Sequence, residues 1–235
     1  MIQLRGEYVT EDPRLDRLKQ FDERSRLFRA AEGIEQYPLR SYSWNKTIWL
    51  DQGAEGACVG FGCTHELAAR PVVVPGLTNH FAREEVYWEA QKIDPWEGGS
   101  YPGAQPTYEG SSVLAGVKVL QARGFLSEYR WAFGEEDLAR TIGYRGPVVL
   151  GLNWYEGMFD ADGDGFIHVD GGLAGGHCIL AAGFSLKLDA YRLDNSWGIE
   201  WGVNGSCYLS RSDMSRLLAE DGEACIFVKR GKGAI

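Results

Sequence analysis

Four kinds of segment are missing from this chain of 235 residues. No apolar run approaches the roughly 20 residues that a membrane-spanning helix needs. The first residues, Met-Ile-Gln-Leu-Arg-Gly-Glu, have neither the basic start nor the apolar stretch of a secretory signal peptide. There is no internal repeat and no low-complexity tract. With 44% hydrophobic residues, the composition is that of a globular protein with one large domain or two small ones.

Positive charge is scarce relative to negative charge. Lys and Arg number 24 against 33 Asp and Glu, which gives a net charge of −9. Nucleic acids and anionic membranes are polyanions that such a chain would repel. We therefore expect no nucleic-acid partner and no membrane partner, while the oligomeric state is left open.

Paired cysteine motifs are absent as well. No two cysteines form a C-x-x-C pair, so the pattern does not predict a zinc knuckle. The chain has five cysteines, and this odd number leaves at least one thiol free in a monomer. With no export signal, we expect free thiols and a cytoplasmic setting. The five cysteines are Cys58, Cys63, Cys178, Cys207 and Cys225.

Residues 1–36 differ in composition from the remainder, 37–235. From 12 to 32 the charges are mixed, and the spacing of four apolar residues fits a thin stripe on a helix. These residues are Leu15, Leu18, Phe21 and Leu27. The segment is interpreted as an N-terminal arm laid on the main body, a short pro-segment or a partner-binding tail.

The main body changes from helical to strand-like patterns. Helices are expected over 58–70, 82–93 and 112–122, and Gly60 and Gly62 in the first of them indicate another backbone packed close. Short apolar strands are expected over 147–153, 178–184, 191–193, 206–210 and 224–229. This order predicts an α+β fold with a helical lobe at about 50–130 and a β lobe at about 140–230.

Cys58 is the first candidate for chemistry. It stands where a glycine-rich turn becomes a helix, and the positive end of a helix stabilises a thiolate. A buried structural cysteine is the alternative. Gln52, six residues earlier, could supply a side-chain amide that binds an oxyanion together with the backbone N–H of Cys58. The alternative for Gln52 is a solvated loop residue.

Among four histidines, His177 is the best candidate for a base. It follows two glycines and begins an apolar run that predicts a core strand. His65 follows Cys58 by two helical turns, about 10 Å, too far for a hydrogen bond to its sulfur. His80 precedes a helix and has no distinguishing neighbours, and His168 lies in a loop of glycines and aspartates. A hydrogen-bonded core histidine remains the alternative for His177.

The block Asn-Ser-Trp-Gly-Ile-Glu-Trp-Gly-Val-Asn-Gly, which begins at Asn195, gives this histidine partners. Asn195 could hydrogen-bond one imidazole nitrogen and fix its tautomer. Trp197 could cover that bond and keep water out. A tight turn with tryptophans as core filler is the alternative.

These motifs together resemble the papain-like cysteine peptidases. The pattern Gln-Gly-x-x-Gly-x-Cys-x-x-Phe runs from Gln52 through Cys58 to Phe61, and the block at Asn195 is complete. The segment from Gly176 to Phe184 is similar to the family's histidine strand, and 146–149 to the first strand of its second lobe. The resemblance covers about residues 40–230.

The resemblance implies a papain-like fold in which the nucleophile helix of a helical lobe packs against an antiparallel, barrel-like β lobe. It implies a cysteine endopeptidase that hydrolyses peptide or protein substrates through Cys58, His177, Asn195 and Gln52. Gly110, Ser111, Gly176 and Trp197 would then border the substrate cleft. An imidazolium partner would lower the thiol pKa and make Cys58 the fastest-reacting cysteine.

Departures from the family pattern leave alternatives open. The family usually has a disulfide-bonded cysteine where this chain has Glu55, a tryptophan where it has Val59, and a second glycine where it has Ser111. A long inhibitory pro-domain does not fit into 1–36. The implied relatives are bacterial or bacteriophage peptidases, located in the cytoplasm, or in the host cytoplasm or virion. The alternatives are a catalytically silent peptide-binding or virion assembly protein, and a peptidoglycan endopeptidase, although such enzymes generally lack the Asn195 block.

An acidic loop begins like a calcium-binding EF-hand. Asp160, Asp162 and Asp164 stand at the first three ligand positions, but the twelfth position, normally Glu, is Gly171. Strands rather than helices are expected on either side. A carboxylate-rich turn is therefore favoured over a calcium site, and no metal or other cofactor is expected for the reaction.

Overall fold

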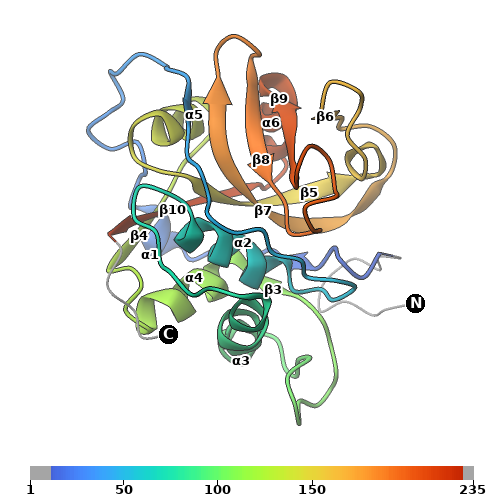
Figure 1. Cartoon of the computed structure of the whole chain (residues 1–235). Helices are drawn as coiled ribbons and strands as arrows, with labels where there is room; N and C mark the ends of the chain where they lie inside the picture. The colour runs from blue at the N-terminus through green and yellow to red at the C-terminus, as the bar shows by residue number, and fades with distance from the viewer. Residues whose placement is uncertain (1–11, 230–235) are drawn as a thin grey trace.

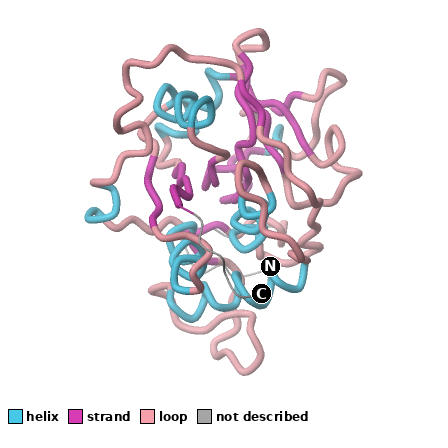
Figure 2. Tube along the Cα trace, turned by 60° about the vertical axis from the view of Figure 1, so that its left-hand side comes forward, coloured by secondary structure: helices cyan, strands magenta, loops and turns pink. Residues whose placement is uncertain are grey.

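A helix that begins at Cys58 lies between two lobes. In the computed structural model, which describes residues 12–229, helices α2 (Cys58–Ala68), α3 (Trp88–Ile93) and α4 (Val113–Ala122) pack together below an eight-stranded sheet (Figures 1 and 2). The π-helical segment η1 (Phe81–Tyr87) leads into α3. This arrangement confirms the predicted α+β fold with a helical lobe and a sheet lobe.

The glycines of α2 let neighbouring segments approach its backbone. A Cβ atom on Gly60 would lie 2.2 Å from the carbonyl oxygen of Ala82 in η1. A Cβ atom on Gly62 would lie 2.7 Å from Cys178 Sγ on the sheet. The expectation of close packing at these glycines is confirmed. At Gly62 the close packing holds α2 directly against the strand that carries His177.

The sheet follows the predicted strands and extends them. Its strand order is β4-β10-β5-β7-β8-β9-β6, with β2 also paired to β7. The longest pairing is antiparallel, between β5 and β7, and sets Leu152 opposite His177. The strands are β2 (Tyr42–Ser43), β4 (Glu128–Trp131), β5 (Val148–Tyr155), β6 (Phe166–Ile167), β7 (Leu173–Ser185), β8 (Ala190–Asp194), β9 (Ser206–Ser210) and β10 (Glu223–Lys229).

The sequence patterns missed helices α5 (Glu135–Tyr144) and α6 (Arg211–Ala219) and three strands of this sheet, β2, β4 and β6. Both helices pack beside the sheet. A short 3-10 turn, η2 (Glu156–Met158), directly follows β5. Strand β4 pairs antiparallel with β10. Across the described residues, no helix combines the length and apolar character needed to cross a membrane.

Residues 12–36 run between the two lobes rather than forming the expected amphipathic helix (Figure 1). Strand β1 (Arg17–Leu18) pairs parallel with β3 (Ser111–Ser112), and the only helix in the segment is α1 (Glu23–Arg26). The helix prediction is wrong because Leu15 is buried at the end of a turn and Leu18 in strand β1, whereas Leu27 remains 80% exposed. Residues 1–11 lie outside the described part of the chain.

Candidate active site

His177 and Asn195 meet as the sequence predicts. Strand β7 carries His177, and Asn195 directly follows β8, the neighbouring strand. His177 Nε2 lies 2.8 Å from Asn195 Oδ1, and both side chains are buried. The amide oxygen is an acceptor, so this contact holds a proton on Nε2 and leaves Nδ1 available to take or give one.

Two tryptophans enclose this pair. The rings of His177 and Trp197 have centroids 4.9 Å apart, and Trp154 approaches the imidazole edge-on at 4.7 Å. Trp197 is only 8% exposed. Water is therefore kept from the His177–Asn195 bond, which is the role expected of Trp197.

The sulfur of Cys58 lies beside the same strand. Cys58 is the first residue of α2, and its Sγ accepts hydrogen bonds from the backbone N–H groups of Cys178 and Asp16. Because Cys178 is the next residue after His177, the thiol is adjacent to the imidazole-bearing position. The structure thus places the Cys58 thiol beside β7, at the residue that follows the His177–Asn195 pair along the strand.

Gln52 is held in place by the Asn195 block. The backbone N–H of Gln52 donates to the Ser196 carbonyl at 2.9 Å, and Ser196 Oγ donates to Gln52 Oε1 at 2.7 Å. The amide Nε2 consequently faces the cleft, where it donates to the carbonyls of Glu55 at 2.7 Å and Arg14 at 3.2 Å. The sequence did not single out Ser196 as a positioning residue.

The chain's own N-terminal segment fills the cleft. The carbonyl oxygen of Asp16 accepts the N–H of Ser111 at 3.3 Å, and a Cβ on Gly110 would lie 2.6 Å from that oxygen. A Cβ on Gly176 would lie 2.3 Å from the carbonyl oxygen of Arg17. The residues expected to border the substrate cleft, Gly110, Ser111, Gly176 and Trp197, therefore contact residues 14–17; for Trp197 the contact is Arg14, whose guanidinium lies 4.1 Å from the ring centroid.

This occupied cleft changes the titration of both candidate groups. Burial raises the pKa of the Cys58 thiol to about 12, despite the hydrogen bonds that favour its thiolate. Burial also lowers the pKa of His177 to about 4, against the raising effect of Asn195. Both shifts favour the neutral forms while residues 12–18 occupy the cleft, because burial disfavours the charged thiolate and imidazolium. The fast-reacting Cys58 thiolate stays a prediction, for a cleft that these residues have left.

The other three histidines have different partners. His65 is buried in α2, where its Nε2 accepts the N–H of Leu50 at 3.1 Å. It therefore supports the turn that leads to Gln52, a role that the sequence did not reveal. His80 pairs with Glu84 and His168 with Asp162, both at exposed positions.

The departures from the family pattern have structural explanations at two positions. Glu55, which stands where a disulfide-bonded cysteine is usual, forms an ion pair with Arg83 of η1. Val59 is fully buried in the core of the helical lobe. All five cysteines are buried and free.

The acidic loop is folded as a turn. Asp162 Oδ1 accepts the backbone N–H groups of Asp164 and Phe166, each at 2.9 Å, while Oδ2 lies 2.8 Å from His168 Nε2. Between residues 12 and 229, no group of three or more His, Cys, Asp or Glu is arranged to hold a metal ion. Calcium binding by Asp160, Asp162 and Asp164 is the less favoured alternative in the sequence, and it stays untested.

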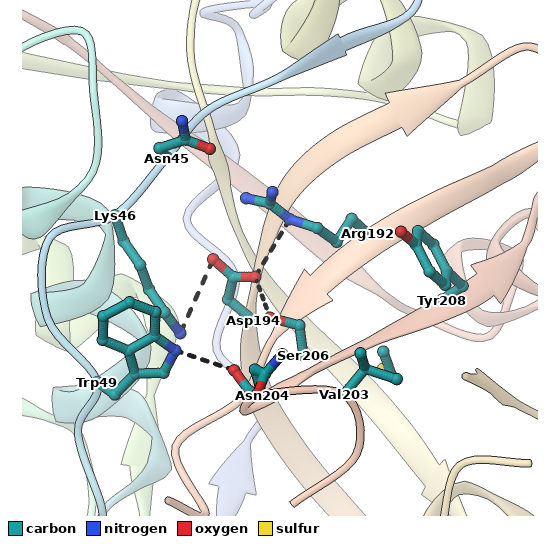
Figure 3. A pocket seen from close by; sticks show the side chains of 10 residues that line it. Asn45, Lys46, Trp49, Arg192, Asp194, Val203, Asn204, Ser206 and Tyr208 are labelled. Atoms are coloured by element: carbon teal, nitrogen blue, oxygen red, sulfur yellow. Dashed lines mark hydrogen bonds and ion pairs between the residues drawn. The ribbon is translucent and has the colours of Figure 1, made fainter. Parts of the chain in front are cut away.

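A pocket of about 430 Å³ lies outside the cleft (Figure 3). In it, Asp194 lies between two cations: Lys46 Nζ is 3.8 Å from Oδ2, and Arg192 Nε is 3.3 Å from Oδ1. Burial lowers the pKa of Lys46. Asp194 is the last residue of β8, so these ion pairs fix the strand end from which Asn195 projects.

Comparisons with known proteins agree with this geometry. The family model described as papain family cysteine protease matches residues 82–224, which include His177 and Asn195 but not Gln52 or Cys58. Cathepsin B of Dictyostelium discoideum is 30% identical over 81 residues, 34% of this chain and 26% of that protein. Cathepsin B-like cysteine proteinase 6 of Caenorhabditis elegans is 28% identical over 80 residues, 32% of this chain and 21% of that protein. The chain thus spans about a quarter of the length of the curated relatives it matches.

Solved structures show the same fold at low sequence identity. Xylellain, a cysteine protease from Xylella fastidiosa, superposes with a TM-score of 0.63 at 15% identity, covering 98% of this chain and all of that one. The bromelain protease of Ananas comosus superposes with a TM-score of 0.57 at 13% identity, covering 80% of this chain and 97% of that one. The fold is papain-like, and because the family model matches more than half of its length, this chain belongs to the papain family of cysteine proteases.

Proposed function

We propose that the protein is a cysteine peptidase in which Cys58 is the nucleophile, His177 the acid and base, Asn195 the group that orients His177, and Gln52 an oxyanion donor. The observation that carries this proposal is the buried His177–Asn195 hydrogen bond, with Gln52 tied to Ser196 beside it and the Cys58 thiol against the strand that bears His177. The His177–Asn195 hydrogen bond of 2.8 Å and the Gln52 amide aimed at the carbonyl of Arg14 are its firmest parts.

In the proposed mechanism, the proton of the Cys58 thiol passes to Nδ1 of His177 once the cleft is open. The thiolate attacks the peptide carbonyl carbon, and the oxygen that becomes negative is held by Gln52 Nε2 and the backbone N–H of Cys58. His177 then protonates the leaving amine, which departs and leaves a thioester on Cys58. Water, deprotonated by His177, hydrolyses the thioester and restores the thiol.

We further propose that residues 12–18 keep the enzyme inactive until they leave the cleft. The carbonyl oxygen of Arg14 receives the Gln52 hydrogen bond that a substrate oxyanion would need, and Asp16 N–H faces the sulfur that must attack. Of the three interpretations of the N-terminal segment, this supports the pro-segment. The short length of the segment is sufficient, since seven residues already reach across Trp197, Cys58 and Ser111.

The experiment that tests the proposal is covalent labelling with an epoxysuccinyl inhibitor, followed by mass spectrometry. Labelling of Cys58 supports the peptidase, with Cys58→Ala as the unlabelled control. A folded protein that is not labelled after the N-terminal segment is displaced would favour the silent peptide-binding or assembly protein. Parallel assays on casein and on cell-wall peptide separate a protein-cleaving enzyme from a peptidoglycan endopeptidase.

We also propose a reducing compartment, the cytoplasm, as the place of action. The five free, buried thiols support it. Intact mass should be the same with and without reductant, whereas a gain of about 2 Da per reduced bridge would contradict the idea.

A further inference from the structure

The pocket outside the cleft is built around one carboxylate with a cation on either side (Figure 3). Lys46 belongs to the segment that precedes α2, whereas Arg192 and Asp194 belong to β8. The side chains of Lys46 and Asp194 are only 4% and 2% exposed. Among the residues that the structure describes, no other charged side chain lines this pocket. Two positive charges thus meet a single negative charge, which leaves the pocket with a net positive charge.

The ammonium group of Lys46 lacks a hydrogen-bond acceptor. Its Nζ has no hydrogen-bond partner within residues 12–229, and Asp194 Oδ2, at 3.8 Å, lies beyond hydrogen-bond length. An ammonium group has three donors, and burying them without acceptors is unfavourable. Burial accordingly lowers the pKa of Lys46, against the raising effect of Asp194. A negatively charged acceptor beside Nζ would remove this penalty.

The acceptor does not come from Asp194, because that side chain is already held elsewhere. Its Oδ1 accepts a hydrogen bond from Ser206 Oγ at 2.8 Å and lies 3.3 Å from Arg192 Nε. Its backbone is paired on both sides, with Leu180 of β7 and Ser206 of β9. Arg192 is fixed as well, since its Nη2 donates to the Trp44 carbonyl at 2.7 Å. The missing acceptor would therefore come from a separate molecule.

The walls of the pocket fit a ligand with an apolar part. The volume of about 430 Å³ falls in the range of small-molecule sites. Trp49 and Tyr208 supply aromatic surface at the sides. Trp49 is 49% exposed, its ring centroid lies 5.8 Å from Lys46 Nζ, and its Nε1 donates to the Asn204 carbonyl at 2.9 Å. A ligand that reaches the ammonium group therefore also changes the surroundings of this indole ring.

We propose that this pocket binds a small organic molecule that carries one carboxylate and an apolar, planar part. The ligand carboxylate accepts hydrogen bonds from Lys46 and is attracted by Arg192, while the apolar part lies against Trp49. One negative charge is favoured over two because it leaves the pocket neutral while Asp194 stays ionised. The inference is independent of the peptidase function, since the pocket lies outside the cleft.

The first test is a series of four probes of similar shape that differ in charge. Calorimetry at neutral pH compares benzoate, benzamide, phenylphosphonate and benzylammonium on the full wild-type chain. We expect benzoate to bind roughly tenfold more tightly than benzamide, because its hydrogen bonds are charge-assisted. Phenylphosphonate should bind several-fold more weakly than benzoate, and benzylammonium should not bind. Benzamide that binds as tightly as benzoate, or phenylphosphonate that binds more tightly, would overturn the proposal.

A lysine variant then assigns the binding to this pocket. Lys46→Met keeps the length of the side chain but removes its charge, so the affinity for benzoate should fall to that for benzamide. The matched control is Lys118→Met, because Lys118 also forms a long ion pair, with Asp22 at 3.7 Å, but lies on α4. Circular dichroism verifies that both variants are folded. A folded Lys46→Met chain that binds benzoate as the wild type does, or an equal loss in both variants, would contradict the site.

Asp194→Asn should change the affinity in the opposite direction, which unfolding cannot imitate. The amide keeps an oxygen for Ser206 but removes the charge that repels an anion. Benzoate should therefore bind several-fold more tightly than to the wild type. Weaker binding of benzoate to a folded Asp194→Asn chain would contradict an anion site beside this carboxylate.

Tryptophan fluorescence locates the ligand without any change in charge. Benzoate should alter the emission of the wild-type chain, and Trp49→Phe should remove most of this change. The calorimetric affinity of Trp49→Phe should stay within a few-fold of that of the wild type, because phenylalanine keeps an aromatic wall. A fluorescence change that persists in full in Trp49→Phe would place the ligand elsewhere and overturn the proposal.

Discussion

The carbonyl oxygen of Arg14 accepts a hydrogen bond from the side-chain amide of Gln52, with Nε2 and O 3.2 Å apart. The same arginine places its guanidinium over the ring of Trp197 and pairs with Asp12 at 2.6 Å. One residue of the N-terminal segment thus engages both the proposed oxyanion donor and the cover of the His177–Asn195 bond. Its side chain offers a way to loosen the segment without touching Cys58.

Arg14→Ala should open the cleft and expose Cys58. A cation–π contact contributes about 0.5–2 kcal/mol, so we expect the iodoacetamide rate of Cys58 in the full chain to rise by several-fold to roughly 30-fold. The rate is read from the modified peptide by mass spectrometry. The control is Arg24→Ala, whose side chain is 90% exposed and pairs with Asp22 beside it. Identical rates in both variants would mean that Arg14 does not help to close the cleft.

Asn195→Ala should impair catalysis more than folding. Without its Oδ1, the imidazole of His177 loses the contact that fixes its tautomer and orientation, and we expect kcat to fall by about 10–100-fold. The measurement is kcat on a peptide substrate in the Arg14→Ala background, together with the free energy of unfolding.

The matched control for that variant is Asn45→Ala, because Asn45 lines the pocket outside the cleft. We expect its kcat to stay within twofold of the parent. If Asn195→Ala retained full kcat while losing stability, Asn195 would be a structural residue and not a positioning residue.

The site could be predicted because its residues lie in short, distinctive motifs. Gln52 and Cys58 are six residues apart on one turn, and Asn195 brings Ser196 and Trp197 with it, so each local pattern carries most of its own geometry. The strands around His177 were also predictable, since a buried strand is a continuous apolar run. The antiparallel pairing of β5 with β7 sets Leu152 opposite His177.

The path of the N-terminal segment could not be predicted for a physical reason. Leu15 and Leu18 are three residues apart, a spacing that fits a helix as well as an extended chain inserted between two lobes. The extended form prevails because its backbone groups find partners in the cleft, such as Ser111 for Asp16. The buried ion pair of Arg17 with Glu223 was missed because the two residues are 206 positions apart in the sequence.

Gln52→Ala should reduce catalysis without preventing folding. An oxyanion donor contributes about 2.7–4 kcal/mol to the barrier, or roughly 10²–10³ in kcat. Gln52→Glu keeps the size of the side chain and its acceptor for Ser196 but loses the donor, so it should be equally impaired. Ser196→Ala removes the 2.7 Å hydrogen bond that orients the amide and should lower kcat by a smaller factor, with little change in KM. A fully active Gln52→Glu enzyme would exclude the amide as a donor.

His65→Ala should destabilise the fold without reducing catalysis. The variant leaves the Leu50 N–H without its acceptor and opens a cavity in α2, which we expect to cost about 2–4 kcal/mol of unfolding free energy. In folded protein, kcat should remain close to that of the parent, since His65 does not reach the sulfur. Chemical denaturation and a peptide assay on the same sample separate the two effects, and His177→Ala, which should abolish turnover, is the comparison.

The closed state of the cleft should become less stable in acid, and the direction of this change follows from the pKa of His177. In the closed state its pKa is lowered to about 4 by burial, whereas a solvated imidazole titrates near 6.5. The open state therefore binds more protons as the pH falls below 6.5, so closure is most stable above that pH and is lost progressively toward pH 4. Between pH 7.5 and 5 the loss is about 2 kcal/mol, roughly 30-fold in the open population.

Hydrogen–deuterium exchange of residues 12–20, corrected for the intrinsic effect of pH, measures this loss of protection. Burial alone would raise the pKa of Asp12, but hydrogen bonds from Arg14 lower it overall. Asp12 therefore titrates below the range from pH 5 to 7.5. Burial raises the pKa of Glu223 in the closed state, so its protonation works in the opposite direction. In His177→Gln we accordingly expect the loss of protection in acid to vanish or to reverse sign. A wild-type segment equally protected at pH 7.5 and 5 would show that His177 is not buried neutral beneath it.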